Sequence, residues 1–527
     1  MGNESAVQDV AGHTGPRLSL CMIVKNEERW LPGCLASIRG CVDEIIIGDT
    51  GSDDGTIGIA RSYGARVVHI PWTGDFSAAR NAVIVEATGD WILALDADER
   101  LAEKSAQGLR SLLSDVRASA YLVLIQGDHH LATGLISQVN AYPRLFRRHP
   151  AIRYEGLVHE QITPSLRRAG FQVRPSDLVI VHLGYAESLE KVREKCVRNL
   201  GILRAQLSGN PADPYIRFQI GNTLAVLEKY DEAARELEPV LSSKTVTPGI
   251  RAATHNLLAE IDIRNGRFRA AHEHCIESLK RARHQTIARW YLAASCIGEG
   301  AYADAIPPLR EILRSHAHGD HGKHPEIAHD IVLAESAVRS RIGLCYEYLR
   351  KYGEASAAYR LAVMADPESR EAVEAYLRTR EALNRPEETV VEIRTLQAQG
   401  VMHPHLGIAC AKCCRMLGRH AEAYEILSTL PDGGEPAGII PALLMIWNLL
   451  DGDLGAAEEQ YRAARAQGAS SYEFHRAAVD LALRSGDSRR AIEHLERCAV
   501  FPGRDVSAIK QRLEKLKGRL SSAMAPT

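Results

Sequence analysis

Apolar residues change their spacing along this chain of 527 residues, and the change divides it into two parts. Up to about residue 185, short apolar runs alternate with amphipathic stretches, as in βα units. The runs that predict strands cover 18–24 (LSLCMIV), 44–48 (EIIIG), 66–70 (RVVHI) and 91–95 (WILAL). Nearly continuous apolar strands joined by helical crossovers predict a Rossmann-like α/β domain with a mostly parallel sheet, covered on both faces. Ligands of such sheets bind at the carboxyl ends of the strands.

The second part of the chain carries a helical repeat. Segments 220–241 and 342–363 align with glycine, tyrosine and alanine at matching positions. A small residue recurs every 34 residues at Ala355, Thr389, Ala423, Ala457 and Ala491, after earlier copies at Ala233, Ala271 and Ala305. A sustained period of 34 residues, with a small residue where two helices cross, resembles the tetratricopeptide repeat. We therefore predict an all-α solenoid of about eight helix pairs.

These patterns place the expected domain boundaries. We expect a disordered N-terminal tail over 1–16, the α/β domain over 17–185, a helical linker over 186–212, the repeats over 213–498, and a C-terminal helix and tail over 499–527. One repeat spacing is 50 residues instead of 34, so an insertion lies there, around the histidine-rich segment 316–330. Histidine-rich loops are more often solvated than metal-bound, and no cysteine or regular spacing supports a metal site in this one.

Composition narrows the class of protein. Charged residues make up 25% and hydrophobic residues 45% of the chain, as in ordinary folded proteins, and the net charge is −2. Because there is no basic block, nucleic-acid binding is disfavoured. The N-terminal residues form no apolar export signal, and the most apolar stretch, 438–450, is too short to span a bilayer. Eleven scattered cysteines then favour reduced thiols, so we expect a cytoplasmic protein without a transmembrane segment.

Acidic residues directly follow the fourth predicted strand. Burying a carboxylate is costly unless a cation or hydrogen-bond donors compensate it. Asp96 and Asp98 stand two positions apart, so in extended backbone both side chains point to the same side. Carboxylate oxygens suit Mg²⁺ or Mn²⁺, whose shells are completed by water and phosphate oxygens. The alternative is a solvated helix start that Asp98 or Glu99 caps.

Two further segments place polar residues at the same edge of the sheet. In 45–56 (IIIGDTGSDDGT), Asp49 ends the second strand and two glycines allow a tight turn. This segment is neither a GxGxxG fingerprint nor a P-loop, so a dinucleotide or ATP cradle is poorly supported. The Asp49 carboxylate could instead accept a hydrogen bond from the imide N–H of a uracil. In 74–91, Arg80 lies one helical turn into a predicted helix, within reach of a diphosphate.

Four segments of the first part, considered together, resemble a known family. CMIVKNEE, DTGSDDGT, DFSAARN and DWILALDADE follow one another within eighty residues, in the order seen in family 2 glycosyltransferases of the GT-A fold. The fusion of such a domain to tetratricopeptide repeats is similar to a bacterial subgroup that includes the S-glycosyltransferase modifying the peptide sublancin. The resemblance covers roughly residues 17–185. It implies an enzyme that takes a sugar from a nucleotide donor.

The resemblance also implies roles for individual residues on the donor side. Asn26 and Glu27 would line the nucleotide pocket at the end of the first strand. Asp49 would read the base, and Arg80 would lie by the donor nucleotide or its phosphates. Asp96 would touch the ribose or the sugar.

For the metal and the acceptor, the resemblance points to residues much further along the chain. Asp98 and a late histidine, His182, are implied as ligands of a divalent metal, Mg²⁺ or Mn²⁺. An acidic residue is implied on the acceptor side, and Glu160 fills that position. His159 precedes it, so which of the two takes the acceptor proton stays open. The histidines at 129–130 are expected at a loop or hairpin tip.

These roles combine into a functional hypothesis. We expect a metal-dependent, inverting glycosyltransferase with a nucleotide-diphosphate sugar, preferably a UDP-sugar, as donor. The repeats favour a peptide or protein acceptor, because helical solenoids present concave surfaces to extended peptides. The alternatives are a lipid-linked or polysaccharide acceptor in cell-envelope synthesis, or a non-enzymatic repeat scaffold with a decayed nucleotide-binding domain. The sugar, the acceptor atom and the formation of a homo-oligomer stay open. Removing residues from about Asp213 onward is expected to spare donor hydrolysis but abolish protein modification.

Overall fold

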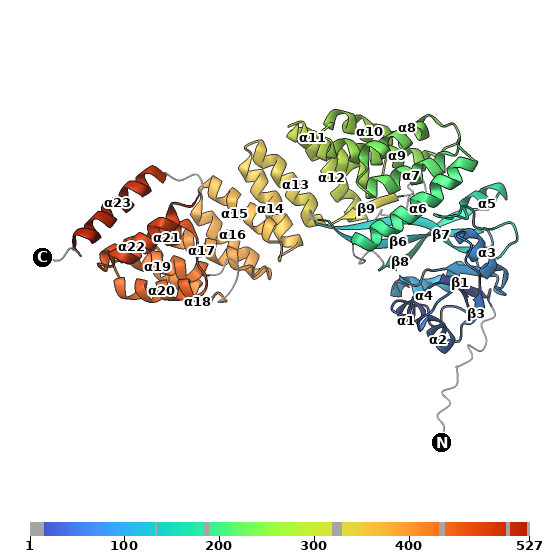
Figure 1. Ribbon diagram of the computed structural model, residues 1–527, viewed down its shortest axis with the longest axis horizontal. Coiled ribbons are helices and arrows are strands. Elements are labelled where there is room, and N and C mark those ends of the chain that lie inside the picture. Colours follow the sequence, from blue (N-terminus) through green and yellow to red (C-terminus); the bar gives the residue numbers. More distant parts are fainter. Residues whose placement is uncertain are drawn as a thin grey trace, which may run out of the picture. The chain divides into compact units, whose positions relative to one another are not determined.

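The computed structural model describes residues 15–131, 134–183, 189–318, 329–431, 438–501 and 506–523 (Figure 1). The chain divides into two compact units, Met1–Lys351 and Tyr352–Thr527. The first unit contains the whole sheet and the first helix pairs, and the second contains the remaining helices. The boundary between the units therefore falls inside the repeats, and the domain boundaries read from the sequence stay predictions.

Within the described residues, nine strands form one mixed sheet. Their order is β3-β2-β1-β4-β7-β6-β8-β5, and β9 lies beside β7. The strands are β1 Leu18–Val24, β2 Glu44–Asp49, β3 Arg66–His69, β4 Trp91–Ala94, β5 Glu99–Leu101, β6 Ala120–Leu131, β7 Gly134–Arg147, β8 Val173–His182 and β9 His329–Leu333. The first four are mutually parallel, as predicted, and their bounds agree with the predicted runs to within one residue. The other half is mixed, because β7 runs antiparallel to β4, β6 and β9.

Helices cover both faces of the parallel half. Alternate residues of β1, from Leu18 to Val24, pack into one core with α1, whereas Cys21 faces a second core with α3. Gly48 permits the close approach of α3, since a Cβ atom there would lie 2.5 Å from the Val83 side chain. The helices of this part are α1 Leu31–Ser37, α2 Thr56–Ser62, α3 Phe76–Val85, α4 Glu103–Leu112 and α5 Thr163–Arg168. The α/β prediction is confirmed.

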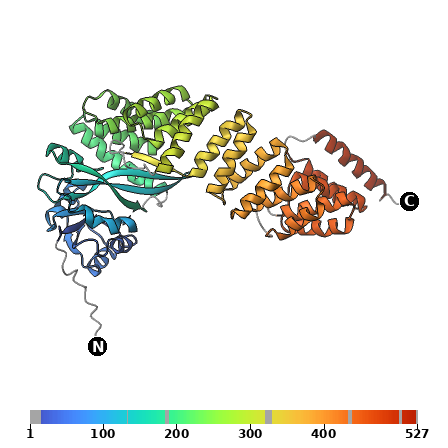
Figure 2. The same cartoon turned by 180° about the vertical axis from the view of Figure 1, so that it is seen from behind.

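A long hairpin, β6–β7, extends beyond the parallel strands and receives a strand from the repeats (Figure 2). The lower part of β7 pairs with β4 at Leu145–Arg147, and the upper part pairs with β9 at Ile136–Asn140. β9 is the end of the histidine-rich insertion, whose residues 319–328 lie outside the described ranges. The insertion thus supplies a ninth strand to the sheet, which no pattern in the sequence had indicated.

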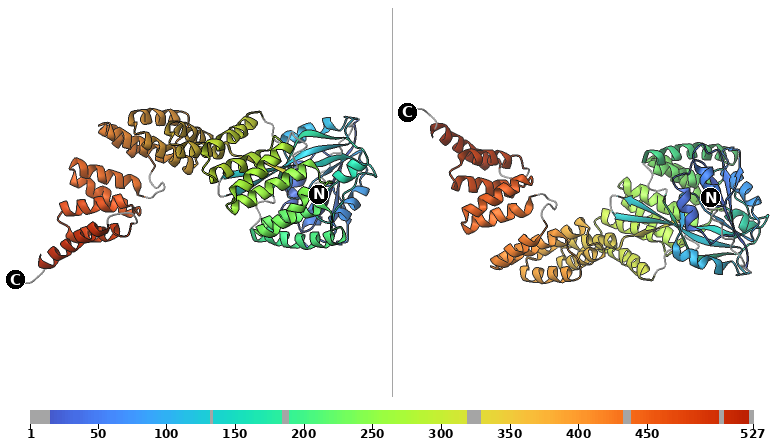
Figure 3. Two further views of the ribbon diagram at one scale, coloured as in Figure 1. Left: turned by 90° about the horizontal axis from the view of Figure 1, so that it is seen from above. Right: turned by 90° about the horizontal axis from the view of Figure 1, so that it is seen from below.

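The remaining helices form the predicted repeats (Figure 3). In the first unit they are α6 Leu189–Gly209, α7 Pro214–Val226, α8 Tyr230–Ser242, α9 Pro248–Arg264, α10 Phe268–Arg281, α11 Thr286–Gly298, α12 Tyr302–His318 and α13 Glu335–Tyr348. In the second they are α14 Tyr352–Ala365, α15 Arg370–Leu383, α16 Pro386–Ala398, α17 Pro404–Met416, α18 His420–Thr429, α19 Ile439–Asp451, α20 Leu454–Ala466, α21 Tyr472–Arg484, α22 Ser488–Cys498 and α23 Val506–Ala523.

The small residues that defined the period occupy equivalent places. Each lies early in an even-numbered helix from α8 to α22, and each is buried, with exposed fractions of 0% for the seven alanines and 3% for Thr389. Gly221 of α7 has the same function on the partner helix, because a Cβ atom there would lie 2.6 Å from Leu237 of α8. Small side chains at these crossings let the helices approach closely, so the solenoid prediction is confirmed.

Candidate functional site

The candidate site lies where the parallel strands end, and two loops form its floor. The loop after β1 turns at Asn26, whose φ of 57° is left-handed. The Asn26 side-chain oxygen accepts from the Asp53 amide at 2.9 Å, and the Glu27 amide donates to Thr56 Oγ1 at 2.7 Å. These bonds join the loop after β1 to the loop after β2. Asn26 and Glu27 therefore lie beside the second loop, as the family resemblance implied.

Asp49 ends β2 and is only 3% exposed. Its carboxylate accepts hydrogen bonds from the amides of Ser52 at 3.1 Å and Gly51 at 3.2 Å. Gly51 has a φ of 107°, which a side chain would disfavour. The Asp49 carboxylate thus shapes the loop in which it lies, and its recognition of a base stays a prediction.

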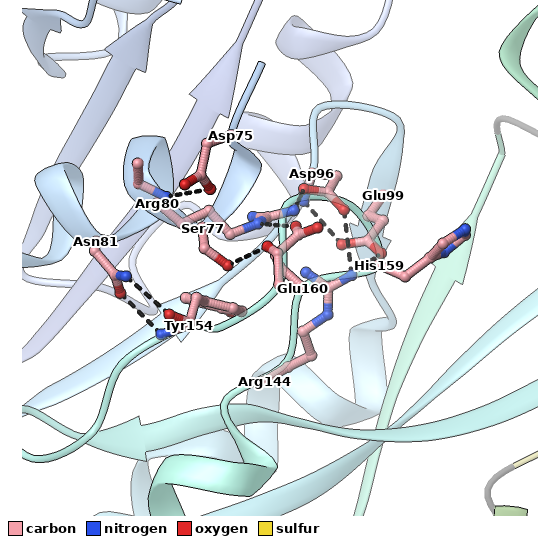
Figure 4. A network of polar contacts seen from close by, with 12 residues as sticks. Asp75, Ser77, Arg80, Asn81, Asp96, Glu99, Arg144, Tyr154, His159 and Glu160 are labelled. Carbon is pink, nitrogen blue, oxygen red and sulfur yellow. Dashed lines mark hydrogen bonds and ion pairs between the residues drawn. The ribbon is translucent and has the colours of Figure 1, made fainter. Parts of the chain in front are cut away.

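A network of ion pairs joins the next three elements (Figure 4). Arg80, in α3, donates from NH2 to Asp96 at 2.7 Å and from Nε to Glu160 at 2.6 Å. Its guanidinium also lies over the ring of Tyr154, 5.4 Å from the centroid. Burial alone would raise the pKa of Asp96, but the charges of Arg80 and Arg144 outweigh it and hold that pKa well below its usual range. Arg80 therefore links a predicted donor residue to the predicted base.

Arg144, in β7, is a member of this network that the sequence analysis did not identify. Its NH2 group donates to Asp96 at 3.2 Å and to Glu99 at 3.0 Å. Glu99 is 1% exposed, and burial raises the pKa of its carboxyl to about 7. Glu99 also accepts from the Asp96 amide at 2.8 Å, so it fixes the backbone of the acidic segment. One arginine in an apolar strand gives no sequence signal of its partners.

Asp98 and His182 meet at the edge of the site, although 84 residues separate them in the sequence. His182 Nε2 lies 3.2 Å from Asp98 Oδ2, and each side chain is 23% exposed. The pairing of β5 with β8 brings them together, since Glu99 is the register partner of His182. Burial lowers the pKa of His182, but the hydrogen bond and charge of Asp98 reverse the effect and raise it. These are the two residues implied as metal ligands.

A metal here would need ligands from outside the protein. No group of three or more His, Cys, Asp or Glu side chains that could hold a metal ion exists among the residues that the structure describes. One carboxylate and one imidazole nevertheless suit Mg²⁺ or Mn²⁺, and Mg²⁺ usually keeps several water or phosphate ligands. The Asp98–His182 pair therefore fits a metal that is shared with a phosphate ligand.

Glu160 and His159 lie in a short loop closed by mutual backbone hydrogen bonds of Glu155 and Gln161, both 3.0 Å long. His159 adopts a left-handed φ of 54°. The two side chains consequently point in different directions, and Figure 4 shows the His159 ring pointing away from Arg80 and Glu160. Within the described residues, the buried Nε2 atom of His159 has no hydrogen-bond partner, and burial lowers the pKa of this imidazole.

α3 holds the start of this loop. The Asn81 amide group donates to the Tyr154 carbonyl at 2.9 Å and accepts from the Tyr154 amide at 2.8 Å. Ser77 donates to the Gly156 carbonyl at 2.6 Å. The Asp75 carboxylate caps the same helix by accepting from the Ala78 amide at 2.9 Å. Arg80, Ser77 and Asn81 thus all act from one helix, which fixes the loop relative to Asp96.

Other predicted features lie away from this site. The histidines at 129–130 belong to β6 next to the hairpin turn, in agreement with the expected hairpin, and their side chains lie outside the described part of the structure. Over the ranges that the structure describes, no helix combines the length and the apolar character needed to cross a bilayer.

Comparison with known proteins gives the sequence context of this site. Residues 19–133 match the profile of the family described as Glycosyl transferase family 2. A TPR repeat-containing protein of Synechococcus elongatus is 38% identical over 262 residues, covering 48% of this chain and 64% of that protein. The SPbeta prophage-derived glycosyltransferase SunS of Bacillus subtilis is 27% identical over 252 residues, covering 46% and 57%. This chain therefore spans less than two thirds of the length of these curated relatives.

Among solved structures, a glucosyl-3-phosphoglycerate synthase from Mycobacterium tuberculosis in complex with Mn²⁺ and UDP is 26% identical. The match covers 21% of this chain and 44% of that one, with a TM-score of 0.18. A TM-score this low supports no conclusion about the fold, which rests on the strand order and the helix pairs of this chain.

Proposed function

Because this chain carries a family 2 glycosyltransferase domain joined to tetratricopeptide repeats, we propose that it is a metal-dependent, inverting glycosyltransferase that uses a UDP-sugar. The observation that carries the proposal is the convergence of Asp96, Asp98, Glu160 and His182 at one edge of the sheet. Arg80 joins the first and third of these residues, and Asp98 contacts His182. A donor grip, a metal pair and a base thus lie within one connected group.

On the donor side, we assign the binding of the metal and diphosphate to Asp98 and His182. A bound Mg²⁺ or Mn²⁺ supplies positive charge that offsets the negative charge of a leaving diphosphate. Asp98 and His182 occupy only part of an ion's coordination shell, which leaves positions for phosphate oxygens. Asp49 and Asn26, at the ends of β2 and β1, are the proposed contacts of the base and the nucleotide, and Asp96 that of the ribose or sugar.

On the acceptor side, we assign the base to Glu160. Its Oε1 atom accepts from Arg80, so the second carboxylate oxygen is the one proposed to take the proton. The acceptor atom attacks C1 of the sugar, the bond from C1 to the phosphate oxygen breaks, and its electron pair leaves with the diphosphate. Attack from the face opposite the leaving group inverts C1, an assignment that rests on the family. The direction of its ring makes His159 the second candidate for the base.

The favoured acceptor is a peptide or protein. Helical solenoids bind extended peptides along their concave surface, and the repeats of this chain contact the α/β domain within the first unit. A lipid-linked or polysaccharide acceptor is the second candidate. Intact mass measurement of candidate peptides and of a glycan acceptor, each incubated with the chain and a UDP-sugar, distinguishes the two.

The proposed metal and base roles predict the loss of turnover in two variants. Asp98→Asn and Glu160→Gln should each lower the rate of transfer, read as UDP release from a panel of UDP-sugars with Mn²⁺, by about a hundredfold or more. A chelator should abolish the wild-type rate, and added Mn²⁺ should restore it. Glu103→Gln is a suitable control, because Glu103 is an exposed residue of α4.

Two outcomes would contradict the proposal. Near-normal turnover in either variant would remove the role assigned to that residue. If the wild type released no UDP and bound neither UDP nor any UDP-sugar of the panel with Mn²⁺, the non-enzymatic scaffold would become the better explanation.

A further inference from the structure

The loop that carries Glu160 touches the repeats directly. α7, the first helix of the repeats, begins at Pro214, and the Asp213 carboxylate caps it by accepting from the Tyr215 amide at 2.9 Å. This cap places Tyr215 in the first turn of the helix. Burial raises the pKa of the Tyr215 phenol, in keeping with a hydroxyl enclosed between the helix and the loop.

The Tyr215 hydroxyl holds the backbone on both sides of Glu160. It donates to the carbonyl of His159 at 3.2 Å, and it accepts from the side-chain amide of Gln161 at 2.6 Å. These two residues are the immediate neighbours of Glu160 in the sequence. One hydroxyl of the repeats therefore restrains the chain before and after the proposed base.

Apolar packing strengthens the same contact. Val158 is 6% exposed and belongs to a hydrophobic cluster made otherwise of repeat residues, including Leu203, Ile216 and Leu237. On the opposite side, the Phe76 amide of α3 donates to the carbonyl of Leu157 at 3.0 Å. The loop is thus held between α3 and the repeats, each of which makes polar contacts with it.

The loop needs such restraint because its backbone is not in a relaxed conformation. Gly156 has a φ of 100°, and His159 has a φ of 54° although it is not glycine. A left-handed conformation of a residue with a side chain is costly and persists only where surrounding contacts enforce it. The hydrogen bond from Tyr215 to the His159 carbonyl is such a contact.

We propose that Tyr215 is a positioning residue for Glu160, so that the first repeat helix completes the active site. The proposal rests on the function given above, in which Glu160 takes the proton of the acceptor. Tyr215 contacts neither Asp98 nor Asp49 in the structure, so it acts on the base and not on the donor grip. The repeats then have a part in catalysis besides any binding of the acceptor.

Tyr215→Phe tests this role, since it removes one oxygen and keeps the ring. With the UDP-sugar that the wild type turns over, chosen from UDP-glucose, UDP-galactose and UDP-N-acetylglucosamine, we expect kcat to fall about tenfold. KM for the donor and Kd for UDP with Mn²⁺ should change less than twofold. Gln161→Leu should give a similar fall in kcat, and the double variant should be no slower than either single one, because both remove the same link.

Tyr291→Phe is the matched control. Tyr291 belongs to the same unit, and its hydroxyl donates to Glu260 at 2.9 Å, away from the loop. This variant should keep the kcat of the wild type. A Tyr215→Phe variant with kcat within twofold of the wild type, or with an equal loss of donor affinity, would overturn the proposal.

A crystal structure of Tyr215→Phe separates failure of this proposal from failure of the proposed function. We expect His159 to leave the left-handed region and the contact of Glu160 with Arg80 to lengthen. If the loop keeps its wild-type conformation, Tyr215 does not position Glu160, whether or not the chain transfers sugars. If the wild type itself neither releases nor binds UDP, the function is refuted, and the structural result alone decides whether Tyr215 holds the loop.

Discussion

At the scale of single residues, the site is a balance of buried charges. Asp96, Glu99 and Glu160 are compensated by the guanidinium groups of Arg80 and Arg144. Charges with so little exposure are tolerated only when each has a partner, because burial removes them from water. The two arginines are therefore needed for the fold of the site as well as for its proposed chemistry.

Replacing Arg144 by methionine should consequently destabilise the protein. The change keeps an apolar chain of similar length but leaves Glu99, which is 1% exposed, without its cation. We expect the free energy of unfolding to fall by about 3 kcal/mol, measured by urea denaturation.

Arg66→Met provides the comparison, since Arg66 and Glu86 form an ion pair whose side chains are 49% and 41% exposed. Loss of an exposed pair should cost less than about 1 kcal/mol. Equal effects of the two substitutions would show that the buried network contributes no special stability. Adding Glu99→Gln to Arg144→Met should recover part of the loss, because it removes the unpaired charge.

Part of this site could be predicted from the sequence. The family motifs placed Asp96 and Asp98 after a buried strand, and the structure brings His182 and Glu160 to the same edge from segments far along the chain. Arg144 and Tyr215 were not predicted, because each acts through a partner that is distant in sequence. A single arginine in a strand, or a tyrosine at a helix start, is equally compatible with many surroundings.

At the scale of elements, two helix pairs share a buried pair of histidines. His255 of α9 and His274 of α10 have their Nδ1 atoms 3.0 Å apart, and His475 of α21 and His494 of α22 have theirs 2.8 Å apart. Both pairs are 19 residues apart in the sequence, so the same place in the repeat is used twice. Two protonated rings could not share such a contact.

These pairs predict a loss of stability in acid. Burial, together with the neighbouring His475, lowers the pKa of His494 from its ordinary 6.5 to about 4. The folded state thus keeps this ring neutral while the unfolded state takes up a proton, so stability is lost as the pH falls from 6.5 towards 4. For one such group the loss is about 2 kcal/mol at pH 5.

Urea denaturation of His494→Gln at pH 7.5 and pH 5 measures this contribution. The variant should lose about 2 kcal/mol less between the two values than the wild type. His420→Gln, at a half-exposed histidine of the same unit, should keep the wild-type difference. A variant His494→Gln with unchanged pH dependence would mean that the pair is not held neutral.

The elements themselves were predicted unevenly. Apolar runs gave the parallel strands almost to the residue, and the period of 34 gave every helix pair. β5 and β9 were missed because strands of three and five residues have too few positions to show a period. The long hairpin was anticipated only at its tip, since the polar residues of β6 and β7 interrupt the apolar alternation.

At the scale of the whole molecule, the unit of folding does not follow the apparent domains. The α/β part shares a hydrophobic cluster, the Tyr215 hydroxyl and the strand β9 with the first repeats. Asp330, at the edge of β9, also caps α11 by accepting from the amides of Thr286 at 3.0 Å and Ile287 at 2.8 Å. Similarity to a family locates a domain in the sequence but does not show which later segments that domain needs.

Truncation should therefore depend on where the chain is cut. The sequence alone led us to expect that a chain ending before Asp213 would still hydrolyse the donor. Such a chain lacks α7 and β9, so we now expect a chain ending at Gly209 to bind UDP with Mn²⁺ at least tenfold more weakly than the full chain. A chain ending at Lys351 retains these contacts and should bind within twofold. Calorimetry on both proteins checks this, and equal affinities would contradict it.

The position of β9 also has a consequence for biosynthesis. β7 ends at Arg147, but the strand that covers its upper edge, β9, follows only about 190 residues later. At a translation rate of 5–20 residues per second, the ribosome needs roughly 10–40 seconds to make that segment. During this interval the nascent sheet has an open edge, which is the kind of surface that chaperones protect from aggregation. The sugar-transfer site therefore cannot mature until most of the first unit has left the ribosome.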